Sequence, residues 1–309
     1  MNSLVLASLS LPNLVSRLPG GVAQGIIWGI MALGVYITFR LLDVADLTVD
    51  GSFTTGGAVT VMLIIAGWPA WAALLAAVVA GLLAGLVTGL LHTKLGIPAI
   101  LAGILTQFAL YSINLRIMSM KANTPVNPDK YSLFLTLRSV PGAIWKGLLL
   151  AAVLIALLYW YFGTEQGSAI RATGANPAMS RAQGININAM KVLGLSLSNG
   201  MVALSGGLMA QYQGFADINM GRGAIVIGLA AVIIGEAIFG KIFHNFALLL
   251  FSVSLGSIVY YLVLQVVIWM GIDTDLLKLL SAVVVAIFLA IPVWKARYFT
   301  KPVKKGGKN

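Results

Sequence analysis

Long apolar stretches recur along this 309-residue chain and most constrain its fold. A helix needs about 20 apolar residues to cross a bilayer, and short polar segments separate stretches of about that length here. Charged residues make up 9% of the chain, against about 25% in a soluble domain. A soluble globule would need more surface charge, and a disordered chain would need low hydrophobicity. The sequence therefore predicts an all-α polytopic membrane protein.

We expect about nine transmembrane helices, within a range of eight to ten, because two of the predicted spans hold few residues for a full crossing. The second and seventh spans are short, Gly-rich and expected to be broken helices. Residues 1–294 would form a single transmembrane domain, followed by a basic cytoplasmic tail at 295–309. The predicted spans are residues 20–42, 52–67, 68–93, 97–119, 143–163, 190–211, 224–240, 246–270 and 276–294.

The orientation of the chain in the membrane follows from the distribution of Lys and Arg, which are more frequent in cytoplasmic loops. Placing the tail inside puts the N-terminus outside and the polar segment 164–188 inside. Lys and Arg on the predicted cytoplasmic side outnumber those on the outer side only when the tail is counted. The tail therefore decides the predicted orientation.

A short motif occurs twice and suggests an internal repeat. Residues 45–49 read ADLTV and residues 216–220 read ADINM, and each motif precedes a short Gly-rich span. Corresponding short spans in two halves are typical of a transport site at a repeat interface. Five predicted spans lie between the copies, so an inverted repeat would place Asp46 and Asp217 at gates on opposite sides. A chance match in a biased composition is the alternative.

The segment LLDVADLTVDGSF carries an acidic cluster after the first span. One interpretation is a gate or vestibule, with Asp46 and Asp50 on one helical face. The other is a solvated turn in which Asp50 caps the next helix.

Polar side chains inside the apolar spans are few, and they usually face the protein interior. They can line a passage or simply join helices, and Glu236 can also be a hydrated residue at the interface. The predicted gate and pathway residues are Asp46, Asp50, Gln107, Asn114, Asn199, Gln211, Asp217 and Glu236. Gly81, Gly85 and Gly89 form a separate row of small residues that favours close helix packing.

No catalytic constellation is visible. The chain has no Cys and only two distant His residues, His92 and His244, so we expect no metal site. It lacks the G-x-x-x-x-G-K-[ST] phosphate loop and the common hydrolase motifs. The net charge of +11 is spread thinly except in the tail, which argues against nucleic acid. We therefore predict a protein that is not an enzyme and binds no cofactor.

The polar segment 164–188 predicts a short helix between two spans. Asn176 is a good N-cap, Pro177 suits the first helical turn, and Gly184 would end the helix. Such a helix is a rigid peg that can transmit a partner's movement to the next span. A loop lying on lipid headgroups is the alternative.

Three motifs in order carry a resemblance to a known family: LDVADLTVDGSF, then RATGANPAMSRAQGIN with its following span, then MGRGAIVIGLAAVIIGEAIFG. They resemble the permease subunits of bacterial ATP-binding-cassette importers, in the group that contains branched-chain amino-acid and ribose permeases. The closest similarity is to a subgroup linked to aromatic amino-acid uptake. The sugar permeases of this group carry an extra N-terminal span, which the residues before Gly20 are too short to supply.

The resemblance implies that the short helix is a coupling helix which enters a cleft of the ATPase. The implied coupling residues are Gly174, Ala175, Asn176, Pro177, Ala178, Met179, Arg181 and Gly184.

The resemblance also implies an assembly in the bacterial inner membrane. Two copies of this chain would join two ATPase subunits, which bind ATP and Mg, and an extracytoplasmic binding protein would deliver a small solute. An ion-coupled secondary transporter with inverted repeats is the alternative function, but most acidic residues lie at span ends or in loops.

Overall fold

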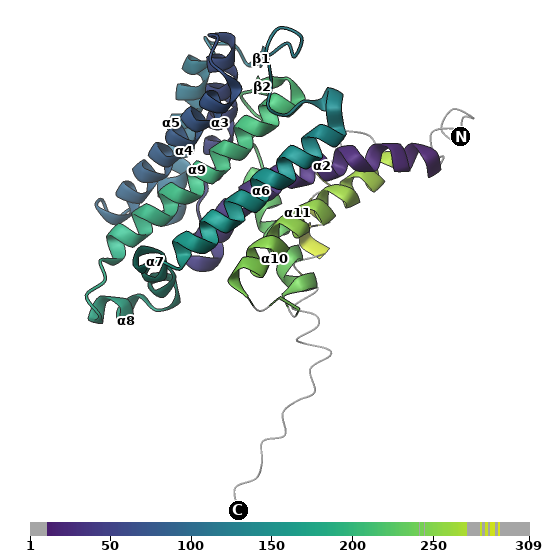
Figure 1. The fold of residues 1–309 in the computed structure, drawn as a ribbon. Coiled ribbons are helices and arrows are strands. Elements are labelled where there is room, and N and C mark those ends of the chain that lie inside the picture. The colour runs from purple at the N-terminus through teal and green to yellow at the C-terminus, as the bar shows by residue number, and fades with distance from the viewer. Residues whose placement is uncertain are drawn as a thin grey trace, which may run out of the picture.

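The computed structural model describes residues 11–240, 242, 243 and 245–270, together with isolated residues between 279 and 290. This part of the chain is a bundle of long helices with one two-stranded sheet (Figure 1). The elements are α2 (Leu11–Tyr36), η1 (Ile37–Leu41), α3 (Thr48–Ile65), α4 (Ala70–Thr93), α5 (Ala99–Ile117), β1 (Asn123–Pro125), η2 (Leu137–Ser139), α6 (Val140–Phe162), α7 (Glu165–Ala175), α8 (Pro177–Ala182), α9 (Ile187–Gln213), β2 (Phe215–Asp217), α10 (Ala224–Phe239) and α11 (Phe246–Trp269).

Seven helices of the described residues are long and apolar enough to cross a membrane: α2, α3, α4, α5, α6, α9 and α11. The prediction of an all-α polytopic membrane protein is therefore confirmed. The seventh predicted span corresponds to α10, which has only 16 residues. The ninth predicted span lies largely outside the described residues, and the tail at 295–309 lies wholly outside them. The count of nine stays a prediction.

The second predicted span is longer than the sequence suggested. The predicted span begins at Ser52, but α3 begins at Thr48 and has 18 residues. Its polar first turn is tolerated because Thr48 and Ser52 are buried and hydrogen-bonded to other helices. With 18 residues α3 is the shortest of the seven long helices, as expected, but it is a continuous helix rather than a broken one.

Helix α9 is the centre of the bundle and packs against α2, α3 and α4. Its 27 residues span about 40 Å at 1.5 Å per residue. The predicted glycine row on α4 faces it: a Cβ at Gly81 or Gly85 would overlap the backbone of α9, and one at Gly89 would lie 2.8 Å from the Cα of Val192. The close approach expected from this row is confirmed.

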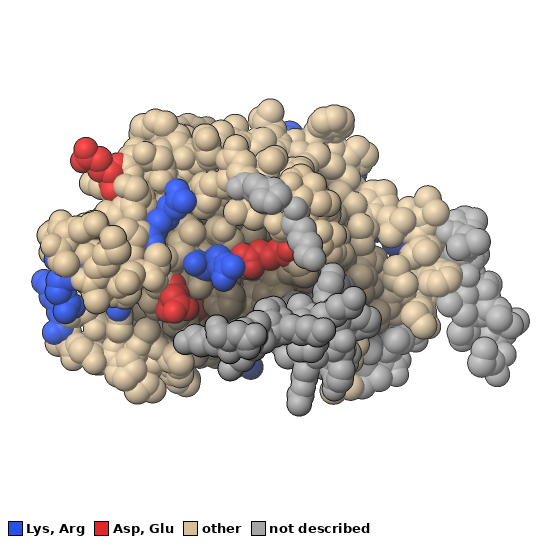
Figure 2. Space-filling model, turned by 90° about the horizontal axis from the view of Figure 1, so that it is seen from below, with Lys and Arg blue, Asp and Glu red and all other residues tan. Residues whose placement is uncertain are grey.

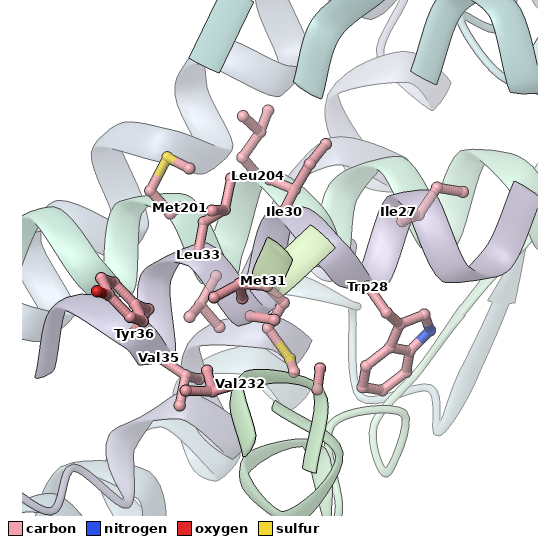
Figure 3. Packing of buried hydrophobic residues seen from close by; sticks show 14 of the residues in the cluster. Ile27, Trp28, Ile30, Met31, Leu33, Val35, Tyr36, Met201, Leu204 and Val232 are labelled. Atoms are coloured by element: carbon pink, nitrogen blue, oxygen red, sulfur yellow. The ribbon is translucent and has the colours of Figure 1, made fainter. Parts of the chain in front are cut away.

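The apolar core lies around α2. Figure 3 shows side chains of α2 meeting Met201 and Leu204 of α9, while Val35 lies beside Val232 of α10. Helix α2 is buried over most of its length, and it ends in the π-helical turn η1. Turns of this kind are rare and occur frequently at functional sites.

The end of the bundle opposite α8 carries a small antiparallel sheet, in which Asn123 pairs with Asp217 and Pro125 with Phe215. It connects the α5–α6 loop to the end of α9. In the same loop, Arg138 pairs through both guanidinium nitrogens with Asp129, and these hydrogen bonds lower the pKa of the Asp129 carboxyl.

Helices α5 and α6 are the most exposed of the seven long helices. Apart from Lys146 near its start, the exposed face of α6 is apolar and carries Trp145 and Trp160 at its two ends, as expected for a helix that faces lipid. The exposed face of α5 also contains polar positions, among them Tyr111, Ser112 and Arg116. The two faces therefore suit different surroundings.

Candidate functional site

A buried polar network lies inside the bundle around Asp46. The side chain of Asp46 is only 3% exposed. Its Oδ1 accepts a hydrogen bond from the Thr48 amide (2.9 Å), and its Oδ2 accepts one from Nδ2 of Asn199 (2.6 Å). Asn199 is near the middle of α9, so Asp46 lies deep in the bundle. The solvated turn is therefore excluded for Asp46, which also precedes α3 and shares no helical face with Asp50.

Hydroxyl groups extend this network across four helices. Ser52 of α3 donates to Oδ1 of Asn199 (2.6 Å), and the Thr48 hydroxyl lies 2.7 Å from that of Thr88 on α4. Thr88 in turn donates to Thr106 of α5 (2.9 Å). We call Asp46, Thr48, Ser52, Thr88, Thr106 and Asn199 the Asp46 network. Satisfied buried networks of this kind fix one arrangement of the helices that they join.

Asp50 caps a helix, but not its own. It lies in the first turn of α3, and its two carboxylate oxygens accept hydrogen bonds from the amides of Gly223 (3.0 Å) and Ile225 (2.9 Å). Those amides belong to the start of α10, where a negative charge is favourable. The N-terminus of this short helix is thus held by α3 rather than by a cap from its own segment.

Asp50 also lines an open cleft of about 190 Å³ between α3, α5 and the β2–α10 loop. Three predicted pathway residues meet there: Asp50, Gln107 and Asn114. Asn114 is 1% exposed, and its Oδ1 accepts no hydrogen bond from the described residues. Thr54, Phe108, Tyr111 and Arg222 complete the polar and aromatic lining.

The remaining three predicted residues lie apart from this cleft. Oε1 of Gln211 accepts a hydrogen bond from the Phe134 amide (2.7 Å) and so ties the α5–α6 loop to α9. Asp217 is at the end of β2, where its carboxylate accepts from the Asn219 amide (2.8 Å). Glu236 pairs with Arg40 of η1 (2.9 Å) and is partly exposed, which agrees with a residue near the interface.

The coupling segment contains two helices, whereas the sequence predicted one. The predicted helix is confirmed as α8: Asn176 accepts from the Met179 amide (3.0 Å), and Gly184 has a positive φ of 81°. The additional helix α7 contains Gly174 and Ala175 in its last turn. Thr164 begins α7 by accepting from the Gly167 amide (3.3 Å), a capping signal that sequence reasoning missed.

Helix α8 projects from the bundle. All of its predicted coupling residues from Asn176 to Arg181 are exposed, and only Ser180 of the helix is buried. Met179 is 59% exposed although it is apolar. Figure 2 shows this end of the molecule, where acidic and basic side chains lie side by side near the middle of the face.

The base of the coupling segment touches the end of the first long helix. A Cβ at Gly174 would overlap the carbonyl group of Leu41, so α7 and η1 meet backbone to backbone. The Arg40–Glu236 pair then joins η1 to α10. A continuous set of contacts therefore leads from α7 through η1 to α10. Asp50 accepts hydrogen bonds from the amides at the other end of α10.

These features define a multi-pass α-helical membrane protein whose interior holds a hydrogen-bonded polar network. Residues 18–298 match the family described as "Branched-chain amino acid transport system / permease component", and the chain belongs to this family of transport permeases. It is similar to the tyrosine transport system permease protein of Clostridioides difficile (strain R20291), with 41% identity over 87% of this chain and 89% of that protein.

A second relative is an uncharacterized protein of Rickettsia prowazekii (strain Madrid E). It is 36% identical over 86% of this chain and 94% of its own length. No solved structure matches this chain. The family supports a transport subunit rather than an enzyme, as the absence of catalytic motifs from the sequence led us to expect.

Proposed function

We propose that this chain is the transmembrane permease subunit of an ATP-binding-cassette importer in the bacterial inner membrane. It forms the passage for a small solute, which we take to be an aromatic amino acid. An extracytoplasmic binding protein delivers the solute, and a separate ATPase subunit binds ATP and Mg and drives transport. The family match over residues 18–298 carries this proposal, and the printed function of the Clostridioides difficile relative supports the substrate.

The exposure of helix α8 favours the proposal that an ATPase subunit binds at this end of the bundle. It offers an apolar side chain, Met179, and a cation, Arg181, on a projecting element. Its neighbour α7 contacts η1 through the backbone at Gly174. A force applied to α8 would therefore reach the transmembrane helices through rigid contacts.

We also propose that two copies of the chain form the passage, with two ATPase subunits bound. A closed two-fold pair is the commonest assembly of identical chains. The exposed, partly polar face of α5 and the cleft beside it suit the passage, while the apolar face of α6 suits lipid. A purified complex with one copy of this chain per two ATPases would contradict the proposal.

The coupling role is tested by Arg181→Glu in the purified complex. We expect lower substrate-stimulated ATP hydrolysis and uptake while the binding protein still docks. Removing one partner of a desolvated charge pair costs about 2–5 kcal/mol of binding free energy at an interface. Arg171→Gln is the matched control, since the Arg171 guanidinium lies over the Phe246 ring of this same chain (4.9 Å). Crosslinks from Ala178 and Met179 to the ATPase should form in the unaltered complex. Normal transport by Arg181→Glu with the ATPase still bound, and no crosslinks, would contradict the assignment of α8.

An ion-coupled secondary transporter is the second candidate, because Asp46 is a buried carboxylate deep in the bundle. Both of its oxygens are engaged by Thr48 and Asn199, which favours a structural role over ion binding. Uptake into proteoliposomes separates the two functions. Uptake by the importer requires ATP and continues in the presence of a protonophore. Uptake by an ion-coupled secondary transporter needs no ATP and is abolished by a protonophore.

A further inference from the structure

The cleft between α3, α5 and the β2–α10 loop brings together opposite charges that do not pair with each other. Asp50 and Arg222 both line it, and the ion pairs found among the described residues involve neither of them. Asp50 already accepts two amide hydrogen bonds, but a carboxylate has about four acceptor positions. Its remaining acceptor capacity is therefore available to a ligand in the cleft.

Asn114 gives a second, independent indication of a ligand. Its carboxamide is almost fully buried, donates one long hydrogen bond to the Gly51 carbonyl (3.4 Å), and leaves Oδ1 without a partner. A buried acceptor without a donor is costly, by about 1–3 kcal/mol in proteins. A ligand that brings an N–H group to this wall of the cleft would remove that cost.

The size and the remaining lining restrict the ligand class. The cleft holds about 190 Å³, which is below the roughly 300–1,000 Å³ of sites for drug-sized ligands. Phe108 and Tyr111 supply aromatic surface on the α5 side, and Phe108 is 73% exposed. A small zwitterion with an aromatic side chain meets all of these groups.

We propose that this cleft is a substrate contact site within the passage, where Asp50 and Asn114 receive the ammonium group of an amino acid and Arg222 pairs with its carboxylate. The ammonium group donates to the Asp50 carboxylate and to Oδ1 of Asn114, and the Arg222 guanidinium donates to the carboxylate of the substrate. The side chain of the substrate lies against Phe108 and Tyr111. This inference rests on the proposed transport function and adds to it a site in the permease itself that selects the substrate.

The absence of Cys from the chain allows a direct test by single-cysteine protection. In the full complex, Tyr111→Cys places a thiol on the cleft wall, and Ser112→Cys places one on the exposed neighbouring position outside the cleft. L-Tyrosine should slow maleimide labelling of the first variant and leave the second unchanged. Tyramine, which lacks the carboxylate, and 3-(4-hydroxyphenyl)propionate, which lacks the ammonium group, should protect at much higher concentrations only.

Two further substitutions in the Tyr111→Cys background assign the charges. Arg222→Gln should raise the L-tyrosine concentration needed for half-protection by about tenfold, because a charge-assisted hydrogen bond is lost. It should leave the tyramine concentration unchanged. Arg116→Gln is the matched control on α5, outside the cleft, and should behave like the parent. Phe108→Cys provides a second reporter if Tyr111→Cys does not assemble.

The outcomes separate this inference from the proposed function. ATP-driven uptake of L-tyrosine by the unaltered complex, without protection of either cysteine reporter, overturns the contact site and leaves the importer in place. Equal protection by L-tyrosine and tyramine overturns the role of Arg222. Protection by L-tyrosine without ATP-driven uptake supports the contact site and contradicts the importer.

Discussion

The two copies of the short Asp motif adopt the same turn in different surroundings. In the Asp46 turn (residues 46–48), Oδ1 of Asp46 accepts from the amide two residues later (2.9 Å), and the Asp217 turn (residues 217–219) repeats this bond at 2.8 Å. The second oxygen of Asp46 meets Asn199 inside the bundle at 2.6 Å, whereas that of Asp217 lies 3.5 Å from Asn123 at an exposed site. The motif therefore specifies a local turn, while the surrounding helices decide its burial.

The two turns should differ most in the side of the membrane from which a reagent can reach them. Ala45→Cys and Asn219→Cys introduce thiols at exposed positions beside the two turns. If the repeat is inverted, an impermeant maleimide should label the first only from the α8 side and the second only from the opposite side. Labelling of both from one side would contradict the inverted repeat.

The next contrast is in stability. Asp46→Ala should lower the free energy of unfolding by about 3–6 kcal/mol, because two hydrogen bonds to a buried carboxylate are lost at about 1.5–3 kcal/mol each. It also leaves Nδ2 of Asn199 with only the Leu195 carbonyl (2.9 Å). Thermal unfolding of the purified protein in detergent measures the loss. An unchanged midpoint would mean that the Asp46 network does not hold the helices together.

The smallest effect is expected from Asp217→Ala. Its side-chain bonds lie at an exposed turn, so the loss should stay below about 1 kcal/mol. If Asp217 contributes to a gate, uptake should fall while the unfolding midpoint stays close to that of the parent. A loss of stability equal to that of Asp46→Ala would remove the contrast between the two turns.

Patterns that depend on neighbouring residues were predictable from the sequence. The apolar stretches locate eight of the helices, and Asn176 with Pro177 predicts the start of α8, because capping and apolar periodicity are local. The row of Gly81, Gly85 and Gly89 likewise predicts a close helix contact, although not the helix that it meets.

Long-range partners were not predictable. The sequence suggests that Asp50 caps the helix that follows it, but the carboxylate caps α10, more than 170 residues away. Thr48, Thr88 and Arg222 were not predicted as site residues, because a Thr in an apolar span or in a short connection, or a lone Arg in a loop, gives no sign of its partner. Only the packing of α3, α4, α5 and α10 brings these residues to the network and the cleft.

The glycine row of α4 also limits how this protein can change over evolutionary time. Each of these glycines faces backbone or Cα atoms of α9, so that even an alanine would push two central helices apart. The sequence should therefore change slowly along this α4–α9 seam, the contact that the three glycines make. It should change fast on the outward face of α6, where one apolar residue can replace another in lipid. Lineages that handle different solutes would then inherit the same α4–α9 seam and diverge elsewhere.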